Sequence, residues 1–325
     1  MIQYGLGPIG CAVARQLAQR QGLALVGGVE IDPAKIGKDL GETIGLDCPL
    51  GVTVAESLEK ALAQAEADLV VHTTSSHFSS FQPQIIEILE AGLDVVSTAE
   101  ELSFPWLAHP KEAAEIDAVA KRVGKTVLGT GVNPGFLMDA LPLYLTSLCQ
   151  QVDRIEVIRA INATTRRGPF QKKIGSGMTM ETFNAKMASG EMGHVGLPES
   201  VGMIVQTLGK HLVRTESSVE PVIAEHAIKT DAVDVEPGQV RGLKQVVRAH
   251  TDEGEFMTLT FLAALELEDE KDTIKITGKP ALEVTLQGTN GDIATVAIVV
   301  NAIWPVKEAR PGLLTMPDLP LITLS

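Results

Sequence analysis

The sequence has few aromatic residues and too few basic residues to balance its acidic ones. Aromatic side chains make up 4% of the 325 residues, so we expect a mainly aliphatic core. The 27 Lys and Arg residues stand against 41 Asp and Glu residues, a formal net charge of −14. Because phosphate neutralisation needs a surplus of Lys and Arg on one face, this balance argues against nucleic acid as a partner. It equally disfavours binding to an anionic membrane surface.

Cysteines and long apolar runs are also scarce. Cys11, Cys48 and Cys149 are widely spaced and form no CxxC pair, so they predict neither a disulfide framework nor a metal site. They favour reduced thiols in a cytoplasmic protein. The longest apolar run, residues 293–304, falls short of the roughly 20 residues that span a bilayer, so no membrane segment is expected. Strand-like residues begin at Ile2, so no leader peptide is expected either.

The pattern of apolar residues changes along the chain. The first third alternates short β-rich runs with helical patterns, which is typical of βαβ units and a parallel sheet. From about residue 153, strand-like segments follow one another with few helices, which predicts a mostly antiparallel sheet. The predicted fold class is therefore α/β, with a doubly wound Rossmann domain of residues 1–137 and 292–325. An α+β domain of residues 138–291 is inserted in it, and the helical segment 292–302 is expected to pack on the Rossmann domain.

A glycine-rich turn lies between the first predicted strand and the first predicted helix. Gly5, Gly7 and Gly10 form the pattern GxGxxG, with Pro8 and Ile9 at the start of the helix. In a βαβ unit the first glycine permits the tight turn, the second lets a pyrophosphate approach, and the third allows close helix–sheet packing. The helix N-terminus then offers N–H groups to the phosphates. This context predicts a dinucleotide site, and a glycine-rich turn without a ligand is the alternative.

An acidic residue ends the second predicted strand. Glu30 lies twenty residues after Gly10, where a carboxylate accepts hydrogen bonds from the adenosine ribose hydroxyls. A carboxylate there repels a 2′-phosphate, and Ile31 supplies no Arg to receive one. NAD(H) is therefore favoured as the cofactor, and NADP(H) remains an alternative. Asp32 competes for the same role, although Asp32 followed by Pro33 also suits the capping of a helix.

Hydroxyl residues follow two later predicted strands. Thr73, Thr74 and Ser75 come after one, and Thr98 comes after the other. Because the carboxyl ends of parallel strands line the ligand crevice, these residues are expected to contact the cofactor. Helix capping is the alternative role of these hydroxyl residues, and the same residue can both cap a helix and contact the cofactor. Asn133, just before Pro134, is expected to begin a helix near the nicotinamide, as a cofactor ligand or as a plain N-cap.

Several segments taken together identify a family. The chain resembles the native amine dehydrogenases and the related 2,4-diaminopentanoate dehydrogenases, whose N-terminal half is similar to dihydrodipicolinate reductase. The segments that carry the resemblance are STAEELSFPW (97–106), GTGVNPGFLMD (129–139), RRGPFQKKIGSGMT (166–179), GHVGL (193–197) and ARPGLLT (309–315). The HHxxK segment of true dihydrodipicolinate reductases is absent from this sequence, which argues against that reaction.

The resemblance implies a Rossmann domain, a substrate-binding and dimerisation domain, and a homodimer. It implies nicotinamide-dependent reductive amination of a small ketone or aldehyde with ammonia, with oxidative deamination of a primary amine as the reverse. A glutamate just after the Ser-Thr strand end is the catalytic group in that family, which here means Glu100 or Glu101. Glu101 is favoured, because related Rossmann reductases place the catalytic side chain second in this turn. A carboxylate in a water-poor pocket would stabilise the ammonium and iminium charge and exchange protons.

Five side chains are candidates for the lining of the substrate pocket, although each also suits an ordinary core. They are Phe136, Met138, Phe170, Met178 and His194.

A cluster of cations leaves the substrate open. Arg166, Arg167, Lys172 and Lys173 could bind a substrate carboxylate, as a 2,4-diaminopentanoate-type amino acid dehydrogenase requires, or form a solvated basic loop. Two further alternatives stay open. One is an ammonia-independent reductase similar to dihydrodipicolinate reductase, and the other is a non-catalytic dinucleotide sensor.

Overall fold

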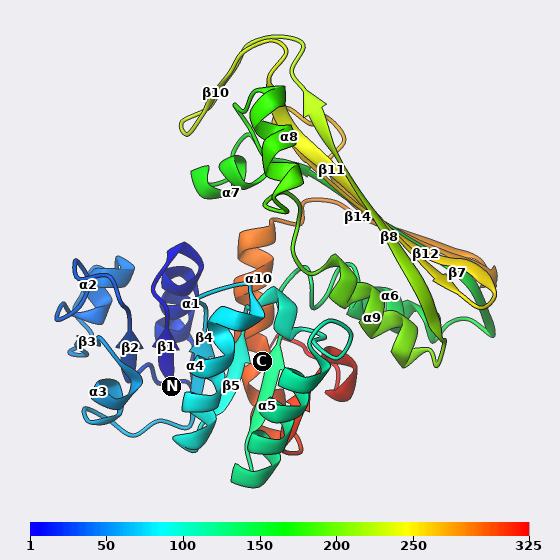
Figure 1. The fold of residues 1–325 in the computed structure, drawn as a ribbon. Coiled ribbons are helices and arrows are strands. Elements are labelled where there is room, and N and C mark those ends of the chain that lie inside the picture. Colours follow the sequence, from blue (N-terminus) through cyan, green and yellow to red (C-terminus); the bar gives the residue numbers. More distant parts are fainter. Residues whose placement is uncertain (325) are drawn as a thin grey trace. The chain divides into compact units, whose positions relative to one another are not determined.

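The computed structural model describes residues 1–324 and divides into two compact units (Figure 1). The first unit combines Met1–Phe136 with the C-terminal segment from Asn290, and the second is Leu137–Thr289. The expected α/β fold class is confirmed, with one parallel sheet and one mixed, mostly antiparallel sheet.

The first unit is built on a seven-stranded sheet in which all paired strands run parallel. The strand order is β15-β6-β5-β4-β1-β2-β3, so the direction of winding changes at β1. In doubly wound sheets, the crevice for a ligand opens at this switch point. The strands are β1 (Ile2–Tyr4), β2 (Gly27–Val29), β3 (Val54–Ala55), β4 (Leu69–His72), β5 (Asp94–Ser97), β6 (Thr126–Gly129) and β15 (Gly312–Leu314).

Helices pack on this parallel sheet, and α10 packs against α1 as expected for the C-terminal segment. None of the helices within residues 1–324 is long and apolar enough to cross a membrane. The helices of the first unit are α1 (Pro8–Gln19), α2 (Leu40–Ile44), α3 (Leu58–Leu62), α4 (Phe78–Glu90), α5 (Pro110–Val123), α10 (Gly291–Asn301) and α11 (Ile303–Glu308), with the 3-10 turns η1 (Glu100–Leu102) and η2 (Met316–Asp318).

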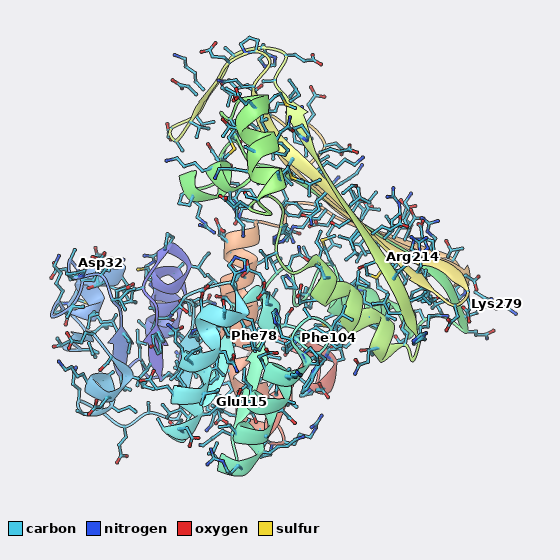
Figure 2. All side chains as sticks on the ribbon, viewed as in Figure 1. Asp32, Phe78, Phe104, Glu115, Arg214 and Lys279 are labelled. Atoms are coloured by element: carbon cyan, nitrogen blue, oxygen red, sulfur yellow. The ribbon has the colours of Figure 1, made fainter. Side chains whose placement is uncertain are left out.

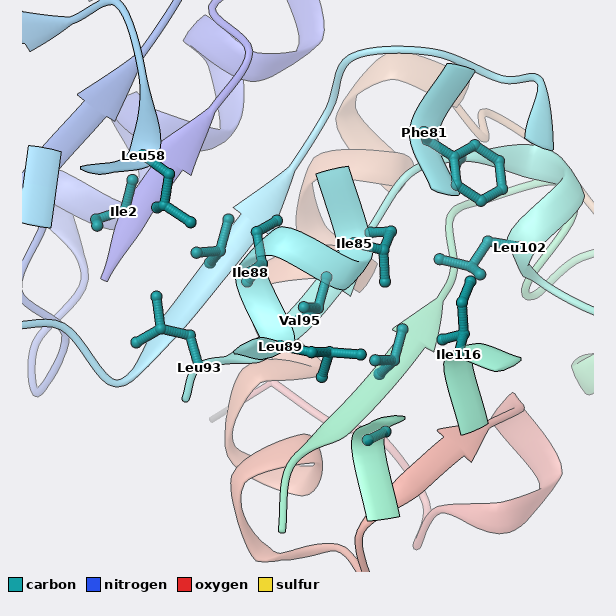
Figure 3. Packing of buried hydrophobic residues seen from close by; sticks show 14 of the residues in the cluster. Ile2, Leu58, Phe81, Ile85, Ile88, Leu89, Leu93, Val95, Leu102 and Ile116 are labelled. Atoms are coloured by element: carbon teal, nitrogen blue, oxygen red, sulfur yellow. The ribbon is translucent and has the colours of Figure 1, made fainter. Parts of the chain in front are cut away.

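The core of the first unit is aliphatic, as the composition predicts. Ile85, Ile88 and Leu89 recur on one face of α4, at the spacing that places side chains on one side of a helix. All three are fully buried, in one cluster with Val95 of β5 and Ile116 of α5 (Figure 3). This packing fixes α4 and α5, and therefore the loops that precede them.

The second unit contains a six-stranded sheet in the order β14-β13-β7-β12-β11-β8, with a separate pair β9-β10. Its neighbouring strands are antiparallel except for β7 and β12, which are parallel. The strands are β7 (Gln151–Asn162), β8 (Leu212–Ile223), β9 (Ile228–Lys229), β10 (Asp234–Val235), β11 (Val240–Thr251), β12 (Gly254–Ala264), β13 (Lys271–Lys279) and β14 (Leu282–Leu286). The helices are α6 (Ala140–Thr146), α7 (Gly168–Lys173), α8 (Met180–Ala188) and α9 (Leu197–Thr207).

Side chains alternate between the two faces of the second sheet. Along β7, Ile155 and Val157 are buried, whereas Ile158 on the opposite face is 38% exposed. The buried face also carries Arg159, which is 2% exposed and has its Nε atom 3.8 Å from Oδ1 of Asp272. Burial lowers the pKa of Arg159 and raises that of Asp272, while the opposite charge of each partner acts against both shifts.

Candidate active site

The glycine-rich turn has the geometry of a dinucleotide-binding turn. Gly5 adopts φ +90°, which side chains rarely allow. A Cβ atom on Gly10 would lie 2.0 Å from the carbonyl oxygen of Gly5, so only glycine lets α1 pack this closely. A Cβ atom on Gly7, in contrast, would meet no atom of residues 1–324 within 4 Å. Packing therefore explains Gly5 and Gly10 but not Gly7.

Two side chains hold the turn from the adjacent strands. The Nε2 atom of Gln3, in β1, donates to the carbonyl of Gly5 at 3.0 Å and to Oγ1 of Thr73 at 2.8 Å. The hydroxyl of Thr73 donates to the same Gly5 carbonyl at 2.9 Å. The structure thus brings Thr73 to the glycine turn, where its hydroxyl bonds to the protein itself.

Glu30 lies beside the glycine turn at the end of β2. Its Oε2 atom accepts a hydrogen bond from the N–H of Leu6 at 2.8 Å, and its Oε1 atom accepts one from the N–H of Ile31 at 2.7 Å. Asp32, labelled in Figure 2, accepts from the N–H of Ala34 at 2.9 Å, in a turn. The carboxylate of Glu30 is therefore tied to the turn, and that of Asp32 to its own loop.

Lys35 also reaches the glycine turn, which the sequence analysis missed. Its Nζ atom donates to the carbonyl of Leu6 at 3.0 Å. The same ammonium lies 3.8 Å from Oε2 of Glu30 and 3.7 Å from Oδ2 of Asp32. A cation is thus present beside Glu30 even though residue 31 is Ile.

A buried histidine links the strand ends. The Nδ1 atom of His72 lies 2.9 Å from Oγ of Ser97, and its Nε2 atom lies 2.8 Å from both Oε1 of Gln84 and Oγ1 of Thr74. Burial lowers the pKa of His72 to about 4, although the hydrogen bond to Gln84 acts in the opposite direction. The ring is therefore neutral at neutral pH. Together these contacts hold the ends of β4 and β5 in a fixed arrangement.

The other predicted hydroxyl residues lie at the same edge of the sheet. Oγ of Ser75 accepts from the N–H of His77 at 3.2 Å, and the N–H of Thr98 donates to the carbonyl of His72 at 3.0 Å. The structure therefore gives the Ser75 hydroxyl a local contact in the loop before α4, whose N-cap residue is His77.

Glu101 lies in η1, directly after β5, and its side chain is 19% exposed. Its Oε2 atom accepts a 2.5 Å hydrogen bond from the N–H of Phe78, the first residue of α4. Oε1 lies 3.2 Å from Nδ1 of His77, and Oε2 lies 3.5 Å from Nε2 of His109. Glu100 begins the same turn and is half-buried. Both predicted carboxylates thus lie at the carboxyl edge of the sheet that carries the glycine turn.

The prediction that Asn133-Pro134 begins a helix is wrong. Residues 131–139 form turns, and the next helix starts only at Ala140, where Asp139 caps it. Gly135 adopts φ +123°, outside the helical region, which interrupts any helix begun at Pro134. Asn133 itself is buried.

The predicted pocket residues fall in different environments. Met138 is fully buried, Phe136 is half-buried, and Met178 is half-buried just before α8. Phe170 lies in α7, with the guanidinium of Arg166 4.7 Å from its ring centre. The ring of His194 packs on Phe261 with centroids 4.4 Å apart. The structure therefore gives Met138 a core position, and Phe170 and His194 ring contacts within the second unit.

Sequence reasoning missed several polar residues of this edge. Gln3 and His72 interrupt otherwise buried apolar strands, and that interruption is a signal that could have found them. His77 and His109 occupy N-cap positions of α4 and α5, where Ser, Thr, Asp or Asn are preferred. An unusual N-cap residue beside a candidate catalytic turn is the corresponding signal.

The parallel sheet, its switch point and the glycine-rich turn define a Rossmann-type dinucleotide-binding domain. The family model of the 2,4-diaminopentanoate dehydrogenase C-terminal domain matches residues 136–324, and that of the dihydrodipicolinate reductase N-terminus matches residues 3–99. The chain belongs to the 2,4-diaminopentanoate dehydrogenase family, which confirms the resemblance drawn from its segments, and it is an oxidoreductase.

Individual relatives agree with this family. The 2,4-diaminopentanoate dehydrogenase of Acetoanaerobium sticklandii is 33% identical over 99% of this chain and 93% of its own length. An amine dehydrogenase of Streptomyces virginiae is 25% identical over 98% of this chain and 96% of its own. The solved amine dehydrogenase structure from Mycobacterium smegmatis matches with a TM-score of 0.90 at 26% identity, covering 100% of this chain and 96% of that one.

Proposed function

We propose that this protein reductively aminates small ketones or aldehydes with ammonia and, in reverse, deaminates primary amines. The observation that carries the proposal is the partly buried Glu101 carboxylate, held at the same strand edge as the glycine-rich turn. The named activities of the relatives support an amine or a carbonyl compound as the substrate.

The glycine turn fits a nicotinamide dinucleotide. Gly5 and Gly10 supply the tight turn and the close packing, and the open space beside Gly7 is what a pyrophosphate needs to approach the backbone. Pro8 and Ile9 begin α1 at this point, so its first N–H groups would face the phosphates. When bound, the nicotinamide supplies or accepts the hydride.

Glu30 and Lys35 favour different forms of the adenosine ribose, the first with free hydroxyls and the second with a 2′-phosphate. The carboxylate of Glu30 suits free ribose hydroxyls, because it would repel a 2′-phosphate. The Lys35 ammonium, 3.8 Å from that carboxylate, offsets this repulsion and offers a donor to a phosphate. The protein is therefore proposed to prefer NAD(H) and to accept NADP(H) less well.

Glu101 is the proposed catalytic carboxylate. Ammonia adds to the carbonyl carbon, and the hydroxyl of the resulting carbinolamine leaves as water only after it takes up a proton. Glu101 donates that proton, and its carboxylate then stabilises the positive iminium. Because the side chain is mostly shielded from water, this attraction is stronger than it would be in solvent.

Glu100 is the second candidate, because the contacts of Glu101 are also those of a helix cap. If Glu101 only caps α4, Glu100 carries the chemistry instead. The two roles are separated by Glu100→Gln and Glu101→Gln, which remove the charge and keep the shape.

The experiment follows NADH oxidation with cyclohexanone, isobutyraldehyde and 2-amino-4-oxopentanoate, each with and without ammonium. We expect ammonium-dependent turnover, and a loss of about 10²–10⁴ in kcat for Glu101→Gln with NADH binding retained. Turnover that does not need ammonium would instead establish a carbonyl reductase. Wild-type turnover in Glu101→Gln, with loss in Glu100→Gln, would assign the chemistry to Glu100.

An amino-acid substrate is the second candidate function. The relative from Acetoanaerobium sticklandii and the basic residues at the start of α7 favour it, since a guanidinium is a good partner for a substrate carboxylate. Preferential turnover of 2-amino-4-oxopentanoate, lost in Arg166→Ala or Arg167→Ala, would support it over simple ketones.

The sheet of the second unit is the proposed dimer surface. One face of β7 is buried and carries Ile155, Val157 and Arg159, while the opposite face exposes Ile158. A second copy that covers the exposed face would give the homodimer, and light scattering of wild type and Ile158→Glu tests it. The three cysteines are free thiols, which supports a reducing compartment such as the cytoplasm.

A further inference from the structure

Two imidazole rings converge on the carboxylate of Glu101. His77 approaches Oε1 from the start of α4, and His109 approaches Oε2 from the start of α5. In the pair of His211 with Asp252, in contrast, one histidine contacts one carboxylate, and both side chains are exposed. Within residues 1–324, no group of three or more His, Cys, Asp and Glu side chains could hold a metal ion, so this cluster needs another explanation.

Neither histidine side chain caps its own helix. His77 and His109 are the N-cap residues of α4 and α5, yet neither ring accepts a hydrogen bond from the helix it precedes. Ser, Thr, Asp or Asn at these positions would satisfy a free N–H group of the first turn. The N-cap side chains of α4 and α5 therefore form no cap hydrogen bond, and in both cases the imidazole contacts Glu101 instead.

The two rings are held differently. The His109 ring stacks on the buried ring of Phe78, with centroids 4.6 Å apart and an interplanar angle of 26°. Phe78, labelled in Figure 2, also donates its N–H to Glu101, so this contact fixes carboxylate and ring together. The His77 side chain is 63% exposed, so one ring nitrogen can face Glu101 while the other faces water.

We propose that His109 positions the Glu101 carboxylate and that His77 passes protons between this carboxylate and solvent. The proposal rests on the proposed function, in which Glu101 gives a proton to the leaving hydroxyl. A hydronium ion in the solvent gives its proton to Nε2 of His77 and becomes water, and the imidazolium then releases its Nδ1 proton to Oε1 across 3.2 Å. The neutral ring and the protonated Glu101 that result balance the proton consumed when water leaves the carbinolamine. Imidazole suits this exchange because it gains and loses protons readily near neutral pH.

Charged residues flank the relay on its own elements, since Lys111 and Glu112 follow His109 in the first turn of α5. Glu100 precedes Glu101 in the same turn, and the two histidines supply the nitrogen atoms. Further along α4 and α5, Gln82 donates to Glu115 at 2.8 Å, and that contact belongs to a separate pair of helix side chains.

The test replaces each histidine with serine, which improves the N-cap while it removes the imidazole. We expect His77→Ser to melt at the same temperature or higher, to bind NADH as the wild type does, and to lose about ten-fold or more in kcat at unchanged KM. Free imidazole should restore part of this activity and should leave the wild type unaffected. His109→Ser should lower kcat without loss of thermal stability, and His211→Ser serves as the matched control with wild-type behaviour.

Three results would overturn the relay or its premise. Wild-type kcat and pH profile in His77→Ser, with Glu101→Gln inactive, would overturn the relay alone. Full recovery of kcat in His77→Asn, which hydrogen-bonds but does not relay protons, would assign a purely structural role. Wild-type turnover in Glu101→Gln would overturn the catalytic assignment of Glu101 and, with it, the relay.

Discussion

A buried polar pair lies at the edge of the sheet in the first unit and inside the sheet in the second. In the first unit, His72 and Ser97 are the last residues of β4 and β5, so their hydrogen bonds lie at the edge of the sheet. In the second unit, Arg159 lies inside β7 and faces Asp272 of the neighbouring β13. Polar groups at strand ends can form hydrogen bonds with a bound ligand. A charged pair inside a sheet is enclosed by protein, so its two members interact only with each other. The first arrangement suits a binding edge, and the second suits a scaffold.

The largest expected effect is on the buried ion pair of the scaffold. Arg159→Ala leaves the Asp272 carboxylate buried without its cation, so we expect a loss of about 3–5 kcal/mol in the free energy of unfolding. Urea denaturation measures it. The double variant Arg159→Met with Asp272→Leu should recover most of the loss, because apolar residues replace both charges. A double variant as unstable as Arg159→Ala would show that the pair also holds the strands in place.

Two glycine variants distinguish the effect of packing on stability from the effect of open space on NADH binding at the glycine-rich turn. Gly10→Ala places a Cβ atom 2.0 Å from the Gly5 carbonyl oxygen, so we expect roughly 3 kcal/mol of destabilisation and loss of NADH binding. Gly7→Ala meets no neighbouring atom of the described chain, so stability should stay unchanged while NADH binding weakens.

A matched glycine of the scaffold controls this comparison. A Cβ atom on Gly242 would lie 2.1 Å from the carbonyl oxygen of Ala263, so Gly242→Ala should destabilise like Gly10→Ala. Denaturation and NADH fluorescence distinguish the three variants. Unchanged NADH binding in Gly7→Ala would contradict the assignment of the open space to a pyrophosphate.

Acidification tests the neutral histidine of the binding edge. The pKa of His72 is about 4 in the folded chain, below its ordinary value of 6.5, so the unfolded chain takes up this proton first. The stability that neutral His72 provides is fully present above pH 6.5 and is lost as the pH falls towards 4, by about 3 kcal/mol. Denaturation at several pH values measures the slope, and His72→Gln should flatten it. An unchanged slope in that variant would assign the acid sensitivity to other groups.

The smallest expected effect concerns the choice of cofactor. Lys35→Ala removes a cation 3.8 Å from Glu30, so affinity for NADPH should fall about ten-fold relative to NADH. The nearby exposed Lys38→Ala provides the control. An equal fall for both cofactors would indicate that Lys35 acts through its contact with the Leu6 carbonyl.

Local sequence patterns predicted the parallel sheet and the glycine turn well, because both depend on short-range signals. Most side chains of β8 are exposed and show no apolar alternation, so a local pattern does not reveal this strand along its length. β15 is only three residues long and follows Pro311, so a local pattern does not reveal it either. Such strands depend on partners distant in sequence, which a pattern within one segment does not contain.

The sequence predicted which residues belong to the candidate site better than it predicted which residues they contact. Glu30 was identified from its position after a strand and Glu101 from the family resemblance, but the side chains that contact these two carboxylates were not predicted. Lys35 and His109 lie five and eight residues beyond the carboxylates they approach, in loops with no motif of their own. Only the folded loops bring them together.

The pairing of β15 with β6 has a consequence for synthesis on the ribosome. β6 ends at Gly129 and β15 begins at Gly312, and the whole second unit lies between them. The first sheet is therefore completed only after the second unit has been translated. The domain that begins the chain is the last to close, and its nascent edge at β6 stays open to solvent and chaperones until then.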